Sequence, residues 1–356
     1  MKKHNYSAGP CILPQEVFEK SAQAILNFND SGLSLLEISH RSKDFVSVMD
    51  QARALALELL GLEGKGYQAL FLAGGASLEF VMAPYNLMKV GGKAAYLDTG
   101  TWAAAAIKEA KLFGETVVVG SSKEDNYNHI PTGYSIPTDA DYFHCTSNNT
   151  IFGTQMKTFP TTEVPVVCDM SSDIFSRVLD FSQFDLIYAG AQKNMGPAGT
   201  TLVVVKESIL GKSGREIPSM LDYSKHIKAE SMYNTPPVFP VYTSLLTLQW
   251  LKNLGGIAAI EKKNNAKADL LYSEIDRNPL FKGAAAVADR SAMNATFLLN
   301  DEAHAPIFDE MWKAAGISGL PGHRSVGGYR ASMYNALPLE SVQVLVDVMK
   351  ALEAKV

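Results

Sequence analysis

The chain has 356 residues, of which 47% are hydrophobic and 19% charged, a balance typical of a globular protein large enough for two domains. Its formal net charge is −5, and it has no long basic run or acidic tail, so charge gives no basis for binding nucleic acid or a membrane surface. The longest apolar runs are too short to span a bilayer, and residues 1–15 lack the apolar core of a signal peptide. We therefore expect a cytoplasmic protein.

The first two thirds of the chain predict an α/β domain. A helix is expected over 14–29, opened by Pro14, and another over 43–61, closed by Gly61. Seven short apolar runs follow, several without polar alternation, which is typical of strands buried on both faces of a mostly parallel sheet. The expected strands are 67–72, 94–98, 116–120, 141–146, 164–169, 185–190 and 200–205, with helices over 77–89 and 102–113 among them.

The pattern changes after residue 206 and predicts a smaller α+β domain. Residues 207–240 are rich in loops, and "ATFLLN" reads as a strand. We place the large domain at 16–256 and the small domain at 257–356, joined by the N-terminal segment 1–15. Helices are expected near 241–254, 257–277, 303–315 and 338–354.

The three cysteines do not indicate a metal site. No CxxC pair exists, so neither a zinc ribbon nor a thioredoxin-like motif is available. Cys145 and Cys168 lie within apolar runs and are expected in the core. Cys11 follows a Gly-Pro turn without a partner that would make it a nucleophile.

Several residues that follow the apolar runs are of types that carry chemistry. Ligands of such sheets bind at the carboxyl ends of the strands, so these residues are expected to lie close together. Asp169 follows one run, and Lys193 follows the next run, 24 positions later, which is the spacing of one crossover unit. The other members of the set are Gly74, Gly75, Ala76 and Ser77 at a helix start, Trp102, Thr150, and Ser171 and Gln192 beside the charged pair.

This set matches the needs of pyridoxal phosphate. A lysine amine traps the aldehyde as a Schiff base, and an acidic partner keeps the pyridine nitrogen protonated. An aromatic side chain stacks on the ring, and the amides of a helix N-terminus hold the phosphate. Each residue alone has a plainer interpretation: Asp169 as a helix cap, Trp102 as core, Lys193 as a solvated surface lysine. The combination in this order is what favours the cofactor.

The arginines suggest a substrate with two anionic ends. The chain has only eight of them, and two follow a histidine directly, in His40-Arg41 and His323-Arg324. The planar fork of Arg330 suits a carboxylate, and the His-Arg pairs suit a phosphate. Chance surface arginines are the alternative.

The motifs together resemble the phosphoserine aminotransferase family, which consists of fold-type I, pyridoxal-phosphate-dependent aminotransferases of class V. The resemblance runs from end to end of the chain. It is most specific in the segments "AGAQKNMGPAG" and "GHRSVGGYRASMYNALP", and it includes "NYSAGPCILP", "EISHRSKDF", "GGASLEF", "DTGTWAAAAIKEA" and "CDMSSDIFSR".

The resemblance implies an activity and a role for each matching residue. The amino group of L-glutamate would pass to 3-phosphohydroxypyruvate in serine biosynthesis, giving O-phospho-L-serine and 2-oxoglutarate. The related phosphohydroxythreonine of pyridoxine biosynthesis is a further substrate that the sequence does not separate from it. Lys193 would form the Schiff base and shuttle the proton, Asp169 would pair with the ring nitrogen, and Trp102 would stack on the ring. Thr150 would bind near the ring hydroxyl, with Ser171 beside the cofactor. Ala76, Ser77 and Gln192 would hold its phosphate, with Asn234 and Thr235 supplied by the second subunit of a homodimer. Arg330 would bind the substrate carboxylate, and His40, Arg41, His323 and Arg324 its phosphate or distal carboxylate, with Ser7 near the entrance.

Glu79 departs from the pattern, because it brings a negative charge close to the expected phosphate site. We expect its side chain to point away from the phosphate. Four other functions stay open: a cysteine desulfurase, an alanine–glyoxylate type of aminotransferase, a cofactor-free Schiff-base lyase, and a binding module on an inactive scaffold.

Overall fold

The computed structural model of the chain describes residues 3–356, and a seven-stranded sheet lies at its centre. The strands are β2 (Tyr67–Leu72), β3 (Lys93–Asp98), β4 (Glu115–Ser121), β5 (Phe143–Thr146), β8 (Val166–Asp169), β9 (Leu186–Gly190) and β10 (Thr201–Lys206). Their order is β2-β10-β9-β8-β5-β3-β4, and only β10 runs antiparallel to its neighbours. The seven predicted runs are therefore the seven strands of a mostly parallel sheet, as expected.

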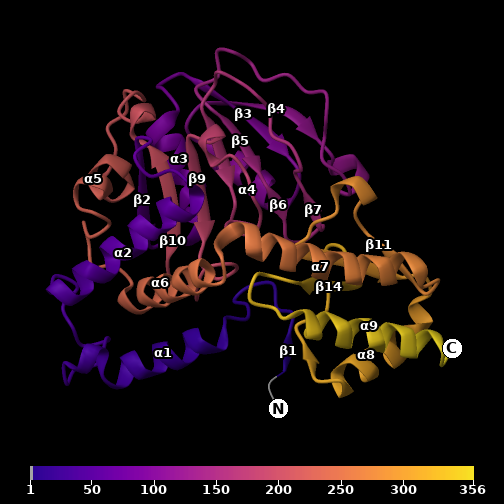
Figure 1. Cartoon of the computed structure of the whole chain (residues 1–356). Coiled ribbons are helices and arrows are strands. Elements are labelled where there is room, and N and C mark those ends of the chain that lie inside the picture. Colours follow the sequence, from indigo (N-terminus) through magenta and orange to yellow (C-terminus); the bar gives the residue numbers. More distant parts are fainter. Residues whose placement is uncertain (1–2) are drawn as a thin grey trace.

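Helices cover both faces of this sheet (Figure 1). One face packs on α3 and α4 through residues such as Phe80 and Tyr188, and the other packs on α2 and α6 through Phe45 and Leu245. Alternate strand residues supply the two cores, which explains why the strands are apolar at nearly every position. The helices of this part are α2 (Lys43–Leu60), α3 (Gly75–Leu87), α4 (Thr101–Ala110), α5 (Tyr223–Lys228) and α6 (Val238–Asn253).

The C-terminal part builds a second core around a small antiparallel sheet. The elements are β11 (Phe281–Gly283), β12 (Asn294–Leu299), β14 (Tyr329–Ser332), α7 (Gly256–Arg277), α8 (Ala305–Ala314) and α9 (Leu339–Glu353). The N-terminal strand β1 (His4–Asn5) pairs with β13 (Ile317–Ser318), so the first residues of the chain join this core. α7 lies between the central sheet and the layer of β14 and α9 (Figure 1). The remaining elements are α1 (Gln15–Leu26) and the hairpin of β6 (Asn148–Asn149) and β7 (Thr154–Gln155).

The predicted bounds differ from the observed ones by a few residues, for local reasons. The helix expected from 77 begins at Gly75, because Gly74 and Gly75 take φ angles of 111° and 69° and turn the chain directly from β2 into α3. The strand expected from 141 begins at Phe143, because the Asp141 carboxylate accepts a hydrogen bond from the Lys89 N–H and pairs with its ammonium. The helix at 43–60 ends as predicted, with Gly61 in the left-handed conformation.

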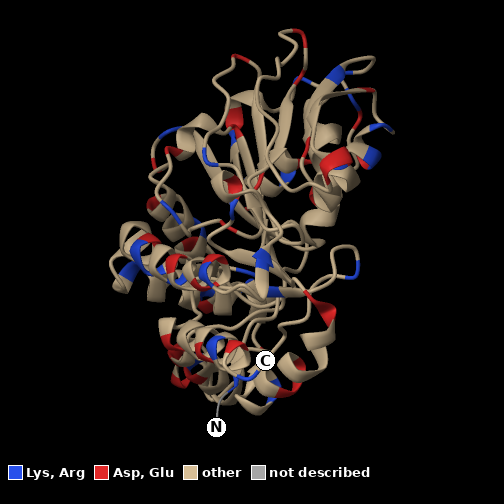
Figure 2. Ribbon diagram, turned by 90° about the vertical axis from the view of Figure 1, so that its right-hand side faces the viewer, with Lys and Arg blue, Asp and Glu red and all other residues tan. Residues whose placement is uncertain are grey.

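The outer surface mixes both signs of charge. Acidic and basic residues alternate along the helices rather than gathering by sign (Figure 2). Within residues 3–356, no helix combines the length and the apolar character that crossing a membrane requires.

Candidate active site

Lys193 lies in the turn after β9, at the carboxyl edge of the central sheet. Its Nζ donates a hydrogen bond to Thr150 Oγ1 at 2.9 Å and lies 6.0 Å from the centre of the Trp102 ring. Burial lowers the pKa of Lys193, Asp169 opposes this shift, and Arg330 adds to it. The amine is thus held still and is easier to deprotonate than a solvated lysine.

The N-terminal segment covers the backbone of Lys193. The Cys11 thiol donates to the Lys193 carbonyl at 2.5 Å, and the Cys11 N–H donates to the Gln192 carbonyl. Gly9 takes a φ of 147°, which residues other than glycine rarely adopt, so this residue lets the segment follow its path over Lys193. The sequence analysis gave Cys11 no role. Its contact with Lys193 spans 182 positions, and no local pattern in the sequence indicates it.

Asp169 ends β8 one strand away and is 5% exposed. The Ser171 N–H donates to its Oδ1 at 2.9 Å, and Ser171 Oγ in turn accepts from the Gly190 N–H. Burial raises the pKa of Asp169, while Lys193 and the Ser171 hydrogen bond act in the opposite direction. Ser171 therefore orients the carboxylate, and a cation placed against Asp169 would favour its charged form.

Two buried ring residues beneath Asp169 were missed from the sequence. Tyr188 is the register partner of Asp169 on β9, and its hydroxyl lies 2.7 Å from His144 Nε2 on β5. Burial lowers the pKa of His144 to about 3, so its ring is neutral at physiological pH. The available signal was the alternation of polar rings with apolar residues in "FHCT" and "LIYAG".

The turn from β2 into α3 is where an anion cradle is predicted. No side chain caps this helix, so the N–H groups of its first turn, where Ala76 and Ser77 lie, are available to a phosphate. Glu79 is fully buried, and its carboxylate accepts a hydrogen bond from the Tyr223 hydroxyl on α5 at 2.5 Å. Its side chain thus turns into the core, as expected.

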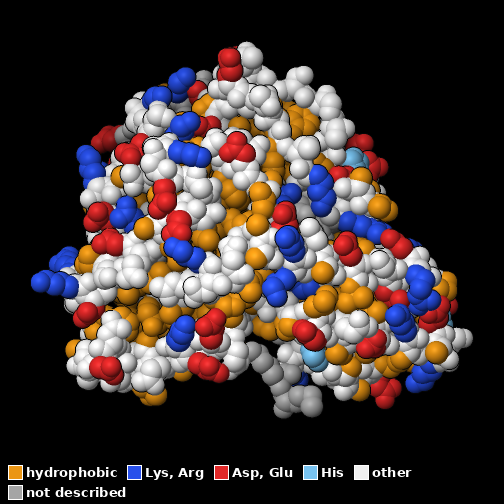
Figure 3. All heavy atoms as spheres, viewed as in Figure 1, with side chains coloured by type: hydrophobic (Ala, Val, Ile, Leu, Met, Phe, Trp, Pro, Cys, Tyr) orange, Lys and Arg blue, Asp and Glu red, His pale blue; other side chains and the backbone are white. Residues whose placement is uncertain are grey.

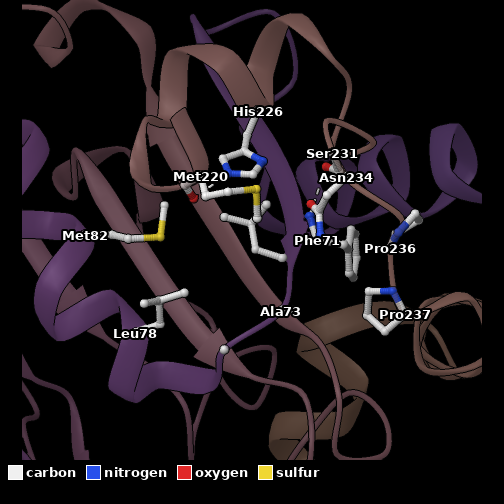
Figure 4. A pocket seen from close by; sticks show the side chains of 12 residues that line it. Phe71, Ala73, Leu78, Met82, Met220, His226, Ser231, Asn234, Pro236 and Pro237 are labelled. Carbon is white, nitrogen blue, oxygen red and sulfur yellow. Dashed lines mark hydrogen bonds between the residues drawn. The ribbon is translucent and has the colours of Figure 1, made fainter. Parts of the chain in front are cut away.

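Asn234 lies behind this cradle in the same chain. It lines a cavity of about 160 Å³ together with Gly74, Leu78 and Met220 (Figure 4). Asn234 and Thr235 are exposed, and the Asn234 amide donates only to the Thr235 carbonyl among the contacts of residues 3–356. Their supply to a neighbouring subunit stays a prediction.

Arg330 on β14 brings the small sheet to the same site. Its Nη1 donates to the Thr150 carbonyl at 3.3 Å, which is the same residue whose hydroxyl accepts from Lys193. Burial lowers the pKa of Arg330. Burial also lowers the pKa of His323, and the charges of Arg330 and Arg324 add to that shift. A guanidinium with five donors and one modest hydrogen bond retains capacity for an anion.

The other predicted substrate residues lie at the rim. His323 Nδ1 lies 2.7 Å from Ser325 Oγ, and Arg324 is exposed beside it. Ser7 packs closely against Gly319, where a Cβ would lie 2.4 Å from Ser7 Oγ. His40 and Arg41 lie before α2, and in the described part of the chain no hydrogen bond of their side chains joins them to Lys193 or Arg330.

The residues at this edge fit pyridoxal phosphate on structural grounds. The helix start without a cap suits a phosphate, the buried Asp169 suits a cationic ring nitrogen, and Lys193 is placed to meet an aldehyde. Trp102 is 38% exposed, which leaves an aromatic face free for a flat ring. The residues of one chain thus offer a partner for the phosphate, the ring nitrogen, the aldehyde and the ring face, and their roles stay predictions.

Comparison with known proteins gives matches along the whole chain. The family described as Aminotransferase class-V matches residues 4–345. The chain is 84% identical to the phosphoserine aminotransferase of Flavobacterium psychrophilum, over 100% of both chains. It superposes on the phosphoserine aminotransferase structure from Bacillus circulans subsp. alkalophilus with a TM-score of 0.96 and 44% identity, covering 99% of each chain. A crystal structure of the enzyme from Trichomonas vaginalis with pyridoxal phosphate bound gives a TM-score of 0.92 at 34% identity, covering 98% of this chain and all of the other.

Proposed function

The chain belongs to the class-V aminotransferase family, and from this premise we propose that it transfers the amino group of L-glutamate to 3-phosphohydroxypyruvate, giving O-phospho-L-serine and 2-oxoglutarate. It is a pyridoxal-phosphate-dependent transaminase. The observation that carries the proposal is the meeting of Asp169, Thr150 and Arg330 around Lys193 at one sheet edge. Two parts of the fold supply this meeting, since Arg330 comes from the small sheet.

Pyridoxal phosphate, when bound, supplies an aldehyde that takes up an amino group and a ring that withdraws electrons from the carbon bearing it. Ala76, Ser77 and Gln192 would hold its phosphate, Asp169 its ring nitrogen and Trp102 its ring face. Thr150 would orient the cofactor ring, and Ser171 would orient the Asp169 carboxylate. All of these groups come from loops and helix starts that follow strands of one rigid sheet, which fixes their mutual distances.

Lys193 would act as the base that moves the proton. A neutral amine at Nζ can remove a proton from the substrate carbon and return it to the cofactor side. Burial, which lowers the pKa of Lys193, raises the fraction of neutral amine at physiological pH. The hydrogen bond to Thr150 Oγ1 keeps the nitrogen directed at the ring face of Trp102.

Arg330 would bind the substrate α-carboxylate, and the His-Arg pairs its distal anion. The guanidinium of Arg330 is partly buried, where a forked contact with a carboxylate is stronger than in water. His323 is partly exposed and lies within electrostatic reach of Arg330 and Arg324, which supports a site for a phosphate or a distal carboxylate next to Arg330. This arrangement favours a phosphorylated acceptor over an alanine–glyoxylate type of substrate, which has no second strong anion.

The homodimer is part of the proposal. Leu26, Leu33 and Leu36 are 77%, 48% and 62% exposed, and they lie close in sequence to His40 and Arg41. A second copy packed there would bury these leucines and carry His40 and Arg41 toward its active site. Apolar side chains also gather on the surface near α1 and α6, at the lower left of the view (Figure 3). We also propose the cytoplasm as its location. The proposed domains, 16–256 and 257–356 with 1–15, are supported by two main cores, with Ile257 and Ile260 at the start of α7 packing into the core of the large domain.

The other functions are less well supported by the site. A cysteine desulfurase needs a reactive thiol, but Cys145 and Cys168 are fully buried, and burial raises the pKa of Cys11 to about 12. A cofactor-free lyase would not explain why Asp169 and Trp102 lie at the site. A binding module on an inactive scaffold would not need Lys193 and Asp169 in working positions.

The test is the visible absorbance of the purified protein. L-Glutamate should abolish the band of the lysine-bound cofactor, and 3-phosphohydroxypyruvate should restore it. Hydroxypyruvate, which lacks the phosphate, is the matched control and should restore it far less. A band that responds to glutamate but equally to both acids would refute the phosphate role of the His-Arg pairs. No band after adding pyridoxal phosphate would refute the role of Lys193.

A further inference from the structure

A second lysine, Lys267, lies in the interior on α7. Lys267 is 1% exposed, and its Nζ donates to the carbonyls of Met333 and Tyr334, both at 2.8 Å. No carboxylate pairs with it among residues 3–356. Burying a lysine is costly, so these two hydrogen bonds are its compensation.

The number of hydrogen bonds suits a neutral amine. Burial, together with the charge of Lys263, lowers the pKa of Lys267 to about 7. A neutral amine has two N–H donors, and Lys267 has two carbonyl acceptors. It therefore needs no counter-ion to hold both.

The carbonyls that Lys267 holds follow the strand of Arg330. β14 ends at Ser332, and Met333 and Tyr334 come directly after it. Arg330 is three residues before Met333, so a shift of the clamped segment would move the guanidinium. The Tyr334 hydroxyl also donates to the Ala8 carbonyl at 2.7 Å, which joins the segment to the cover over Lys193.

Asparagines extend the clamp to the lysine turn. Asn264, one turn before Lys267 on α7, donates to Asn335 Oδ1 at 2.9 Å. The Asn335 N–H donates to Asn194 Oδ1 at 3.0 Å, and Asn194 is the neighbour of Lys193. These residues are all buried, so the network is shielded from water.

We propose that Lys267 is a positioning residue for the transamination: by holding the Met333 and Tyr334 carbonyls it fixes Arg330 at the distance from Lys193 that the substrate α-carboxylate requires. α7 is the element that links the two, since it lies between the central sheet and β14 (Figure 1). The inference rests on the proposed role of Arg330 in binding the carboxylate.

The test is the half-reaction of the holoenzyme with L-glutamate, followed by visible absorbance. Lys267→Met introduces an unbranched side chain only one heavy atom shorter, and it removes both donors. It should raise the half-saturating glutamate concentration by about 10-fold or more, because small misplacements of a binding group are expensive, with a smaller effect on the limiting rate. Lys262→Met, on an exposed lysine of the same helix, is the matched control and should stay within about 2-fold of wild type.

A double-mutant cycle separates positioning from general loss of stability. If Lys267 acts through Arg330, then Lys267→Met added to Arg330→Lys should weaken glutamate binding by less than about 2-fold further. Multiplicative effects, or a fall in melting temperature with unchanged half-saturation, would overturn the proposal. Should Lys267→Met give no soluble holoenzyme, Lys267→Gln is the second variant, because its shorter side chain ends one bond farther from the two carbonyls; an unchanged half-saturation in that variant would overturn the proposal equally. A wild type that ignores L-glutamate would refute the proposed function instead, and O-phospho-L-serine then serves as the amino donor for the cycle.

Discussion

Replacing Asp169 with asparagine removes one charge and little else. Asparagine has the same shape, and its Oδ1 can still accept the Ser171 N–H that now binds the carboxylate at 2.9 Å. Asp169 is 5% exposed, so its partner in the holoenzyme is not screened by water. A hydrogen bond between charged groups contributes about 1.5–3 kcal/mol. Asp169→Asn should therefore weaken binding of pyridoxal phosphate by roughly 10- to 150-fold.

Asp169→Asn should also lower kcat, and by more than the weaker binding of the cofactor explains. At saturating cofactor we expect kcat to drop on the order of 10²–10³-fold, the effect of removing one aligned electrostatic contact. The measurement is an absorbance titration of the apoenzyme with pyridoxal phosphate, followed by steady-state kinetics at saturation. Asp347→Asn, on an exposed aspartate of α9, is the control. A normal kcat at saturating cofactor would show that the charge of Asp169 is not needed.

Three further variants test other parts of the site. Lys193→Ala should still bind the cofactor but lose at least about 10²–10⁴-fold in kcat, the contribution of a positioned base; near-normal turnover would contradict its role. Arg324→Ala should weaken binding of 3-phosphohydroxypyruvate by roughly 10-fold or more. The slow rate with L-alanine, which lacks a distal anion, should stay within about 2-fold of wild type. Burial raises the pKa of Glu79 from 4.5 to about 7, so the stability from its bound proton is complete below pH 4.5 and lost as the pH rises through 7. Thermal unfolding across this range should therefore show Glu79→Gln gaining roughly 3 kcal/mol relative to wild type, and a flat difference would refute the shift.

The central sheet and the charged pair could be predicted because local patterns determine them. Runs without polar alternation mark strands that are buried on both faces, and parallel strands place their carboxyl ends at one edge. Asp169 and Lys193 therefore came together from spacing alone, one strand apart. The sequence did not predict that β10 runs antiparallel. The connection from β9 to β10 is short, but its length alone does not show that these two strands pair with each other.

Lys267 and Cys11 could not be predicted for a different reason. Because Lys262 and Lys263 lie on the same helix, Lys267 reads in the sequence as one more lysine of a solvated face. Its burial depends on β14 and the loop after it, more than 60 positions away. Cys11 meets Lys193 only because β1 pairs with β13 and returns the N-terminal segment to the site. Contacts of this kind carry no periodic signal in the chain.

The charges around Lys193 make its basicity depend on what is bound. Asp169 raises the pKa of Lys193 and Arg330 lowers it. A cationic ring nitrogen against Asp169 would cancel the first effect, and a substrate carboxylate on Arg330 would cancel the second. With both charges neutralised, burial is the main remaining cause that lowers the pKa of Lys193. The amine that becomes free when the substrate takes its place on the cofactor would therefore stay largely neutral, as a base that removes the substrate proton requires.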